Sequence, residues 1–254
     1  MKIIMLAGKG ISAKYIFNGL IDEYKIEKVL ITNSPSKKRM IERRIKNLGF
    51  YNVFNQLLFQ ILIVKPLKTL TASKYESKRE ENKLVNTSIP DEKVINVGNV
   101  NSKITIETIK KLNPDVIIVN GTSIISPKIL NSSNAIFINT HVGITPQYRG
   151  VHGGYWALRN NDKKNFGVTV HLVDKGIDTG SIIYQKTTLI KKDDNFITYP
   201  LHQYALAIPL LKQALEDIAL NKLKTYKKEN AVSKLYYHPT FTKYITGLLF
   251  KGIK

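Results

Sequence analysis

The chain has 254 residues, of which 43% are hydrophobic, so it can form a packed domain and is not globally disordered. It contains no cysteine, which excludes disulfides, thiolate metal ligands and a cysteine nucleophile. The net charge of +20 predicts attraction to polyanions or to small phosphorylated ligands, although a solvated, lysine-rich surface explains the same excess.

The start of the chain does not resemble a secretion signal. A short apolar run is followed at once by Gly8-Lys9-Gly10, without a long apolar stretch or a cleavage site. Elsewhere no run approaches the roughly 20 apolar residues of a membrane span. The basic residues are spread along the chain and form no nucleic-acid-binding motif. We therefore expect a cytoplasmic protein with no membrane span and no nucleic-acid partner.

The first part of the chain has the pattern of a doubly wound sheet. Residues 2–7 are apolar and precede a glycine turn and an amphipathic stretch to Glu23, which predicts strand, tight turn and helix. Residues 28–32 predict the second strand. Residues 36–65 then predict a helix that is basic in its first half and broadly apolar over 50–64. We expect the apolar part to be buried in the core; the alternatives are a partner subunit, as in a homodimer, or a membrane surface.

The middle of the chain alternates between helix and strand. Residues 66–92 carry mixed charges and predict a solvated helix or a mobile loop. The elements that follow are a strand at 94–97, a helix at 102–112 with Ser102 as its N-cap, and apolar strands at 116–119 and 135–138. This pattern predicts an α/β fold: a Rossmann-like, mostly parallel sheet flanked by helices, with ligands at the carboxyl ends of its strands.

The last third of the chain predicts two strands, a long helix and a short tail. A strand is expected at 166–173, and its alternating pattern predicts that it is half-buried. A second strand is expected at 181–190 and the helix at 198–220. The tail after this helix is basic and aromatic. We therefore predict a catalytic domain over residues 1–195 and a C-terminal helix with a small extension over residues 196–254.

Polar residues follow the apolar run at 135–138. Asn139 and His141 are expected just past the end of that buried strand. Acyl transfer to an amine needs a donor aimed at the carbonyl oxygen and a group of near-neutral pKa that manages the proton. Asn139 can supply the first and His141 the second, and their spacing puts both side chains on one face of an extended segment. Asp178 can tune His141 if the fold brings the two together.

Each of these signals is weak by itself, since Asn-x-His is common and an isolated Asp-x-Gly is usually a turn. A zinc site built from His141, His152 and His171 is an alternative, but the spacings match no compact ligand motif, so no metal is expected. A dinucleotide site at Gly8-x-Gly10 is another alternative, but Ala13 stands where a third glycine is needed.

Five ordered elements together are more specific. They are Asn139-Thr140-His141, Ile144-Thr145-Pro146, Tyr148-Arg149-Gly150, Gly167-Val168-Thr169-Val170-His171 and Asp178-Thr179-Gly180. In order and spacing they resemble the folate-dependent formyltransferase family, which includes glycinamide ribonucleotide, methionyl-tRNA and sugar N-formyltransferases. The resemblance is clear over residues 115–190. One departure is His141-Val142-Gly143, where the family often has His-Pro-Ser, which changes the stiffness of the loop and leaves the polar residues in place.

The resemblance implies three catalytic residues. Asn139 and His141 would stabilise the oxyanion, and Asp178 would assist the movement of the proton. It also implies that 10-formyltetrahydrofolate is the cosubstrate.

The resemblance further implies where the folate lies. Its pterin ring is expected beside main-chain groups of residues 121–125 and of the loop at 173–178. The residues expected to bind it are Val119, Gly121 and Val173.

The acceptor is expected to be a small, anionic amine, and its class stays open. Sugar N-formyltransferases are similar to this chain in size, so a nucleotide-linked amino sugar is our first choice. Glycinamide ribonucleotide is the alternative; the glycines expected near its phosphate are present at Gly8 and Gly10, without the Ser-Asn pair of that subfamily. Methionyl-tRNA comes third because its enzymes look longer, and a non-catalytic folate-binding protein comes last. The residues expected to bind the acceptor are Gly8, Gly10, Arg149 and Tyr155.

Overall fold

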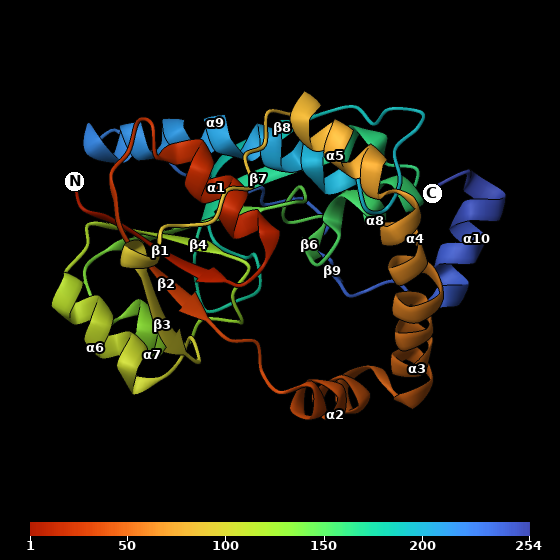
Figure 1. Cartoon of the computed structure of the whole chain (residues 1–254), viewed down its shortest axis with the longest axis horizontal. Coiled ribbons are helices and arrows are strands. Elements are labelled where there is room, and N and C mark those ends of the chain that lie inside the picture. Colours follow the sequence, from red (N-terminus) through yellow and green to blue (C-terminus); the bar gives the residue numbers. More distant parts are fainter.

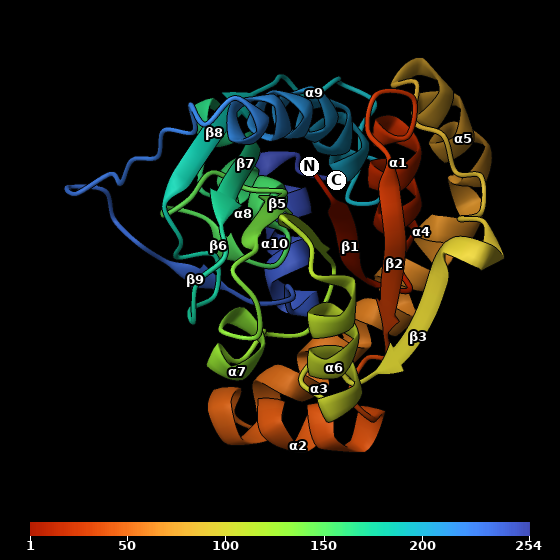
Figure 2. The same cartoon turned by 90° about the vertical axis from the view of Figure 1, so that its left-hand side faces the viewer.

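The computed structural model describes residues 1–254 and contains one main sheet of seven strands (Figure 1, Figure 2). Its spatial order is β3-β2-β1-β4-β5-β7-β8. The strands from β3 to β5 run parallel to their neighbours, whereas β7 is antiparallel to both β5 and β8. In chain order the strands are β1 (Ile3–Gly8), β2 (Ile26–Thr32), β3 (Val94–Gly98), β4 (Val116–Asn120), β5 (Ile136–His141), β7 (Gly167–Leu172) and β8 (Ile182–Thr187). The predicted Rossmann-like, mostly parallel sheet is confirmed.

Helices cover both faces of the sheet. They are α1 (Ile11–Leu20) and α9 (Tyr199–Ala219) on one face, and α6 (Lys103–Leu112) and α7 (Pro127–Leu130) on the other (Figure 1). Within β1, Ile3 and Met5 belong to the core shared with α1 and α9, whereas Ile4 and Leu6 belong to the core shared with α6 and α7. Successive residues of a strand point to opposite faces, so an unbroken apolar run suits a strand that is covered on both sides.

The predicted N-cap of α6 is confirmed. The backbone N–H of Thr105 donates to Ser102 Oγ at 3.2 Å, which satisfies one of the donors left open where the helix begins. At the other end Asn113 adopts a left-handed φ of 44°, and Pro114 follows it, so the helix cannot continue.

The strand β7, which we predicted to be half-buried, is buried on its polar face as well. Thr169 and His171 are 0% and 3% exposed. The loop after β5 covers this face: the N–H of Thr145 donates to Thr169 Oγ1 at 3.1 Å, and the Thr169 hydroxyl donates to the Gly143 carbonyl at 2.8 Å. The alternation of polar and apolar residues therefore reflects polar contacts inside the protein and not a side facing solvent.

The segment after β2 is helical, as predicted, but is divided into short pieces. They are α2 (Lys37–Leu48), α3 (Phe50–Phe59), the π-helical η1 (Gln60–Val64), α4 (Lys65–Leu70) and α5 (Ala72–Glu81). The expected core burial of residues 50–64 is wrong for one face. Val53 and Phe59 are buried, whereas Phe50 and Ile61 are 70% and 59% exposed, because the helix packs against the rest of the chain on one side only. The homodimer stays a prediction.

A second, aromatic core joins α3 to the end of the chain. Phe59 of α3 lies 5.0 Å from Phe196 and 5.2 Å from Tyr244 of α10 (Phe241–Lys251), measured between ring centroids. Aromatic rings at this spacing attract one another beyond the effect of burial alone. The C-terminal helix is therefore held against the segment that follows β2.

A small second sheet ties the tail to the body of the protein. In it β6 (Arg149–Gly150) pairs in parallel with β9 (Leu235–Tyr236). The remaining elements are α8 (Gly153–Arg159) and the 3-10 helices η2 (Asp91–Lys93) and η3 (Lys163–Asn165). Since α9 contributes Ala207 and Leu211 to the main core, the division of the chain after residue 195 stays a prediction.

None of the helices combines the length and the apolar character needed to cross a membrane.

Asp194 holds the corner where α5 meets α9. Its side chain is fully buried and lies 3.0 Å from Lys78 Nζ of α5 and 2.9 Å from His202 Nε2 of α9. Burial alone would raise the pKa of Asp194, but hydrogen bonds from His202, from the Lys191 N–H and from Lys78 hold it well below its usual range.

Replacing Asp194 with Asn should lower the free energy of unfolding at pH 7 by about 3 kcal/mol, because the Lys78 ammonium then stays buried beside one exposed carboxylate. Asp193→Asn is the matched control. That carboxylate is also 3.0 Å from Lys78 but is 57% exposed, so its loss should cost less than about 1 kcal/mol. Urea denaturation measures both. The contribution of Asp194 should decline as the pH falls below about 4, since a lowered pKa stabilises only while the folded carboxyl is ionised. Equal costs for the two variants would contradict this account.

Candidate active site

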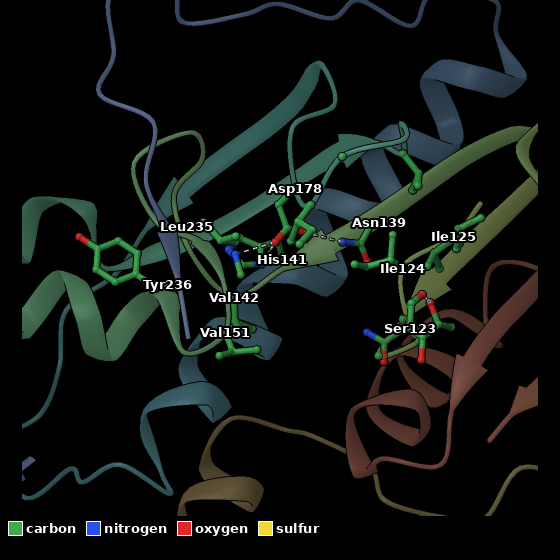
Figure 3. A pocket seen from close by; sticks show the side chains of 18 of the residues that line it. Ser123, Ile124, Ile125, Asn139, His141, Val142, Val151, Asp178, Leu235 and Tyr236 are labelled. Atoms are coloured by element: carbon green, nitrogen blue, oxygen red, sulfur yellow. Dashed lines mark hydrogen bonds and ion pairs between the residues drawn. The ribbon is translucent and has the colours of Figure 1, made fainter. Parts of the chain in front are cut away.

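A cavity of about 550 Å³ lies at the carboxyl ends of β4 and β5. Its walls come from the loop after β4, the end of β5, the loop after β7, the tail around β9 and part of α2. Figure 3 shows Ser123, Ile124 and Ile125 on one side of Asn139, and Leu235 and Tyr236 on the far side. The strand pattern predicted ligand binding at this edge of the sheet.

We had predicted that Asn139 and His141 lie just past the end of the strand. Instead, both lie within β5. The strand continues beyond the apolar run because its antiparallel pairing with β7 extends to His141, which lies opposite Thr169. The predicted common face is found, since both side chains contact Asp178.

Asp178 is the meeting point of the site. Its Oδ2 accepts a hydrogen bond from the Gly150 N–H at 2.9 Å and lies 3.4 Å from His141 Nδ1. Its Oδ1 lies 3.5 Å from both Asn139 Nδ2 and His171 Nε2, so the carboxylate sits between His141 and Asn139 (Figure 3). Burial alone would raise the pKa of Asp178, but the charge of His141, the neighbouring His171 ring and the hydrogen bond from the Gly150 N–H hold it well below its usual range. The carboxyl is therefore ionised, and protein groups hold its charge.

The hydrogen bonds of His141 decide where its proton sits. Its Nε2 lies 2.6 Å from the Tyr148 carbonyl oxygen, which can only accept, so Nε2 carries a hydrogen. Nδ1 therefore faces the Asp178 carboxylate, and this contact is favourable when Nδ1 is protonated as well. The pair can hold a proton at Nδ1 and release it, which is what a general acid or base must do.

His171 orients Asn139, a role that the sequence did not reveal. The His171 Nδ1–H donates to the Leu172 carbonyl at 2.7 Å, so Nε2 is free to accept from Asn139 Nδ2 at 3.1 Å. This contact fixes which end of the Asn139 amide lies beside Asp178. In the sequence His171 is visible as the last residue of the Gly-x-Thr-x-His element, but only the pairing of β5 with β7 places it opposite Asn139.

The three residues predicted to bind folate, Val119, Gly121 and Val173, all line the cavity. The backbone N–H groups from Gly121 to Ile125 donate no hydrogen bond within the chain. Gly121 adopts a left-handed φ of 63°, which glycine does without steric cost. This wall therefore offers open main-chain donors beside apolar side chains, and that combination suits a flat heterocycle with polar edges.

The four residues predicted to bind the acceptor lie outside the lining of this cavity. Gly8 supports the loop after β4, because a Cβ there would be 2.2 Å from a carbonyl oxygen of that loop. Gly10 is the N-cap of α1. Arg149 donates from Nη1 at 2.9 Å to the carbonyl just before Asp178 and so holds the loop that carries this residue. Tyr155 is buried in the aromatic core and lines a neighbouring cavity of about 270 Å³. Direct contact of these residues with an acceptor stays a prediction.

The cavity also has lining residues to which the sequence assigned no role. Arg43 and Arg44 come from α2, and Tyr236 and His238 come from the tail. In the sequence, the arginines belong to a basic stretch directly after the second strand, and Tyr236 and His238 belong to an aromatic C-terminal segment. Neither signal shows where the segment lies, because that depends on long-range packing and on the pairing of β6 with β9.

The three histidines of the alternative zinc site do not come together. His141 and His171 face Asp178, whereas His152 lies 3.0 Å from His238. Burial and the neighbouring ring lower the pKa of His152 to about 3, and burial and a nearby arginine lower that of His238 to about 4. No group of three side chains suited to a metal ion gathers in the chain.

The chain is similar to known proteins in both sequence and fold. The family model described as formyl transferase matches residues 62–200, which is more than half of the chain. A methionyl-tRNA formyltransferase of Caldanaerobacter subterraneus is 32% identical over 139 residues, which make up 54% of this chain and 44% of that protein. The matched region therefore spans less than half the length of that curated relative.

Two solved structures share the fold at 17% identity. One is an N-formyltransferase from Helicobacter canadensis in complex with folinic acid and dTDP-3-aminofucose, with a TM-score of 0.55 over 93% of this chain and 69% of that one. The other is a phosphoribosylglycinamide formyltransferase from Anaplasma phagocytophilum, with a TM-score of 0.57 over 93% of this chain and 99% of that one.

Gly143 leaves the space that the His141 ring needs. A Cβ at this position would lie 2.6 Å from both His141 Nε2 and the Tyr148 carbonyl oxygen. Gly143→Ala should therefore break the hydrogen bond between these two groups and turn the ring away from Asp178. Nitrogen NMR of the imidazole should then lose the signature of an Nε2–H tautomer. Gly247→Ala is the control, since the nearest atom there is at 3.5 Å. An unchanged His141 spectrum in Gly143→Ala would mean that the loop yields and the space is not required.

Proposed function

Because this chain belongs to the formyl transferase family, we propose that it transfers a formyl group from 10-formyltetrahydrofolate to a primary amine. The observation that carries the proposal is the arrangement of Asn139, His141 and Asp178 at one wall of the cavity. An amide donor and an imidazole that both contact one buried carboxylate are the groups that acyl transfer to an amine requires.

The chemistry assigns each group a task. The neutral amine attacks the formyl carbon, a new carbon–nitrogen bond forms, the bond from that carbon to N10 breaks, and one proton passes from the amine to N10. Two hydrogens remain for the formyl oxygen as it gains negative charge: the Nδ1–H of protonated His141, whose Nε2–H is bound to the Tyr148 carbonyl, and the Asn139 Nδ2 hydrogen that is not directed to His171. Asp178 stabilises the positive charge on His141 and takes up the proton of the amine.

The loop after β4 supports a folate on the same wall. When bound, 10-formyltetrahydrofolate supplies the one-carbon unit. The open N–H groups from Gly121 to Ile125 would donate to the polar edge of its pterin ring, while Val119 and Val173 would contact the flat faces. The fold neighbour from Helicobacter canadensis binds folinic acid, a relative of this cosubstrate.

Our proposed acceptor is a nucleotide-linked amino sugar. The tail adds Tyr237 to the cavity lining, and aromatic rings stack on bases and sugars. The ring of Tyr236 stacks instead on Tyr148 and Trp156. The same fold neighbour from Helicobacter canadensis is in complex with dTDP-3-aminofucose, which is a nucleotide-linked amino sugar.

Glycinamide ribonucleotide is the second candidate. Ser12, in the first turn of α1, lines the cavity, and the beginning of a helix offers N–H groups to a phosphate. Methionyl-tRNA, the acceptor in the name of the curated relative, remains a third class to test.

The first test is a formyl-transfer assay with purified protein and 10-formyltetrahydrofolate. The acceptors are nucleotide-linked 3-amino and 4-amino sugars, glycinamide ribonucleotide and charged initiator tRNA. We expect tetrahydrofolate to be released with an amino sugar and with no other acceptor. Release with glycinamide ribonucleotide or tRNA alone would replace our choice of acceptor. Folate binding without any release would favour a non-catalytic folate-binding protein.

Variants of the site test the mechanism. His141→Ala and Asp178→Asn should each lower kcat about 10²- to 10⁴-fold, because the first removes a donor to the formyl oxygen and the second removes the acceptor of the amine proton. Folate binding, followed by fluorescence titration, should persist in both. Asp174→Asn is the control, since this acid lines the same cavity but hydrogen-bonds to the Gly176 N–H and the Thr179 hydroxyl, and kcat should stay within about tenfold. Full activity of either site variant would remove that residue from the mechanism.

A further inference from the structure

Helix α2 has an unusual composition and position. It carries six basic residues against one acidic residue, and none of its residues is buried. It begins shortly after the carboxyl end of β2, at the edge of the sheet where the cavity lies (Figure 1, Figure 2). Because none of its residues is buried, this helix adds little to the core. Its basic side chains are instead free to contact a ligand or the cavity.

Two arginines of α2 line the cavity. Arg43 and Arg44 do so together with Met40 of the same helix and His238 of the tail. Arg44 is half-buried, and desolvation lowers its pKa, yet a guanidinium keeps its charge at neutral pH. Neither side chain forms a hydrogen bond or an ion pair within the chain. A partly desolvated cation with all its donors open is costly to keep unless it meets an anion.

The charges of the cavity are separated. Apart from histidines, its charged lining residues are Arg43 and Arg44 on α2 and Asp174 and Asp178 on the loop after β7. Asp178 contacts His141 and Asn139, whereas the arginines belong to α2, a different element of the lining. A ligand that carries an anion at one end and an amine at the other would match both ends at once.

The guanidinium groups favour one kind of anion. Each presents up to five donors in a planar fork, which matches the oxygens of a phosphate in pairs. Neighbouring arginines on one helix would match two linked phosphates better than one carboxylate. The cavity volume of about 550 Å³ is within the range of small-molecule sites.

We propose that Arg43 and Arg44 form the anion-binding half of the acceptor site and hold the phosphate or diphosphate of a small-molecule amine. This inference rests on the proposed function for the amine end of the acceptor. The arginines would set the KM for the acceptor without taking part in proton transfer, because they lie on a different wall from Asn139, His141 and Asp178.

A binding experiment tests the anion site without any formyl transfer. Isothermal titration calorimetry measures the affinity of the full chain for inorganic pyrophosphate, uridine diphosphate and thymidine diphosphate. The double variant Arg43→Gln/Arg44→Gln should bind all three at least about tenfold more weakly. The matched control is Lys37→Gln/Lys38→Gln, which removes the same charge from exposed positions of the same helix that do not line the cavity. The control should stay within about twofold of the unmodified chain. Tighter binding of a nucleoside diphosphate than of pyrophosphate would show that the site recognises the diphosphate as part of a nucleotide.

Three results would overturn the inference. The first is an equal loss of affinity in both double variants, which would mean that the charge of the helix acts diffusely. The second is that the unmodified chain binds no diphosphate. The third is that only tRNA binds in a way that depends on the arginines. Kinetics with an active acceptor adds a second readout. The acceptor KM should rise at least about tenfold in the arginine variant, while kcat and the folate KM change little. Diphosphate binding that depends on the arginines, without formyl transfer to any amine, would sink the proposed function and leave the anion site standing.

Discussion

The buried carboxylate of Asp178 is the constraint on which the rest of the site depends. A charge removed from water is costly unless donors surround it. Here the donors and partners come from β5 (Asn139 and His141), from β7 (His171) and from β6 (Gly150). These elements are separated along the chain, so satisfying one carboxylate fixes the end of the sheet and two loops relative to one another.

Gly150 extends this constraint to the tail. Its N–H donates to Asp178, while its backbone pairs in β6 with Tyr236 of β9. Its φ is 92°, and a Cβ would lie 2.2 Å from the Tyr236 carbonyl oxygen, so a glycine is required. One residue therefore sets both the position of the acid and the wall that the tail adds to the cavity. The aromatic tail and the basic helix α2 line the same cavity as Asn139, His141 and Asp178, although the family match covers neither.

The sequence predicted the elements better than their surroundings. Apolar runs such as 116–119 identified strands buried on both faces, because nothing but full coverage suits such a run. Residues 166–173 misled us, since their polar side contacts the loop after β5 and not water. Residues 50–64 misled us in the opposite sense: a broad apolar arc predicts burial, yet Phe50 and Ile61 are exposed. Burial is decided by what another part of the chain covers, and no local pattern contains that information.

The sequence by itself determined the alternation of strands and helices and the ordered motif elements that carry Asn139, His141 and Asp178, because propensity, periodicity and spacing are local properties. Only the tertiary structure decided that Asp178 reaches both other residues, that His171 orients Asn139, and that Arg44 faces the cavity. The reason is physical: these contacts join segments far apart in the chain, and their distances follow from strand pairing and core packing, which the sum of local preferences does not fix.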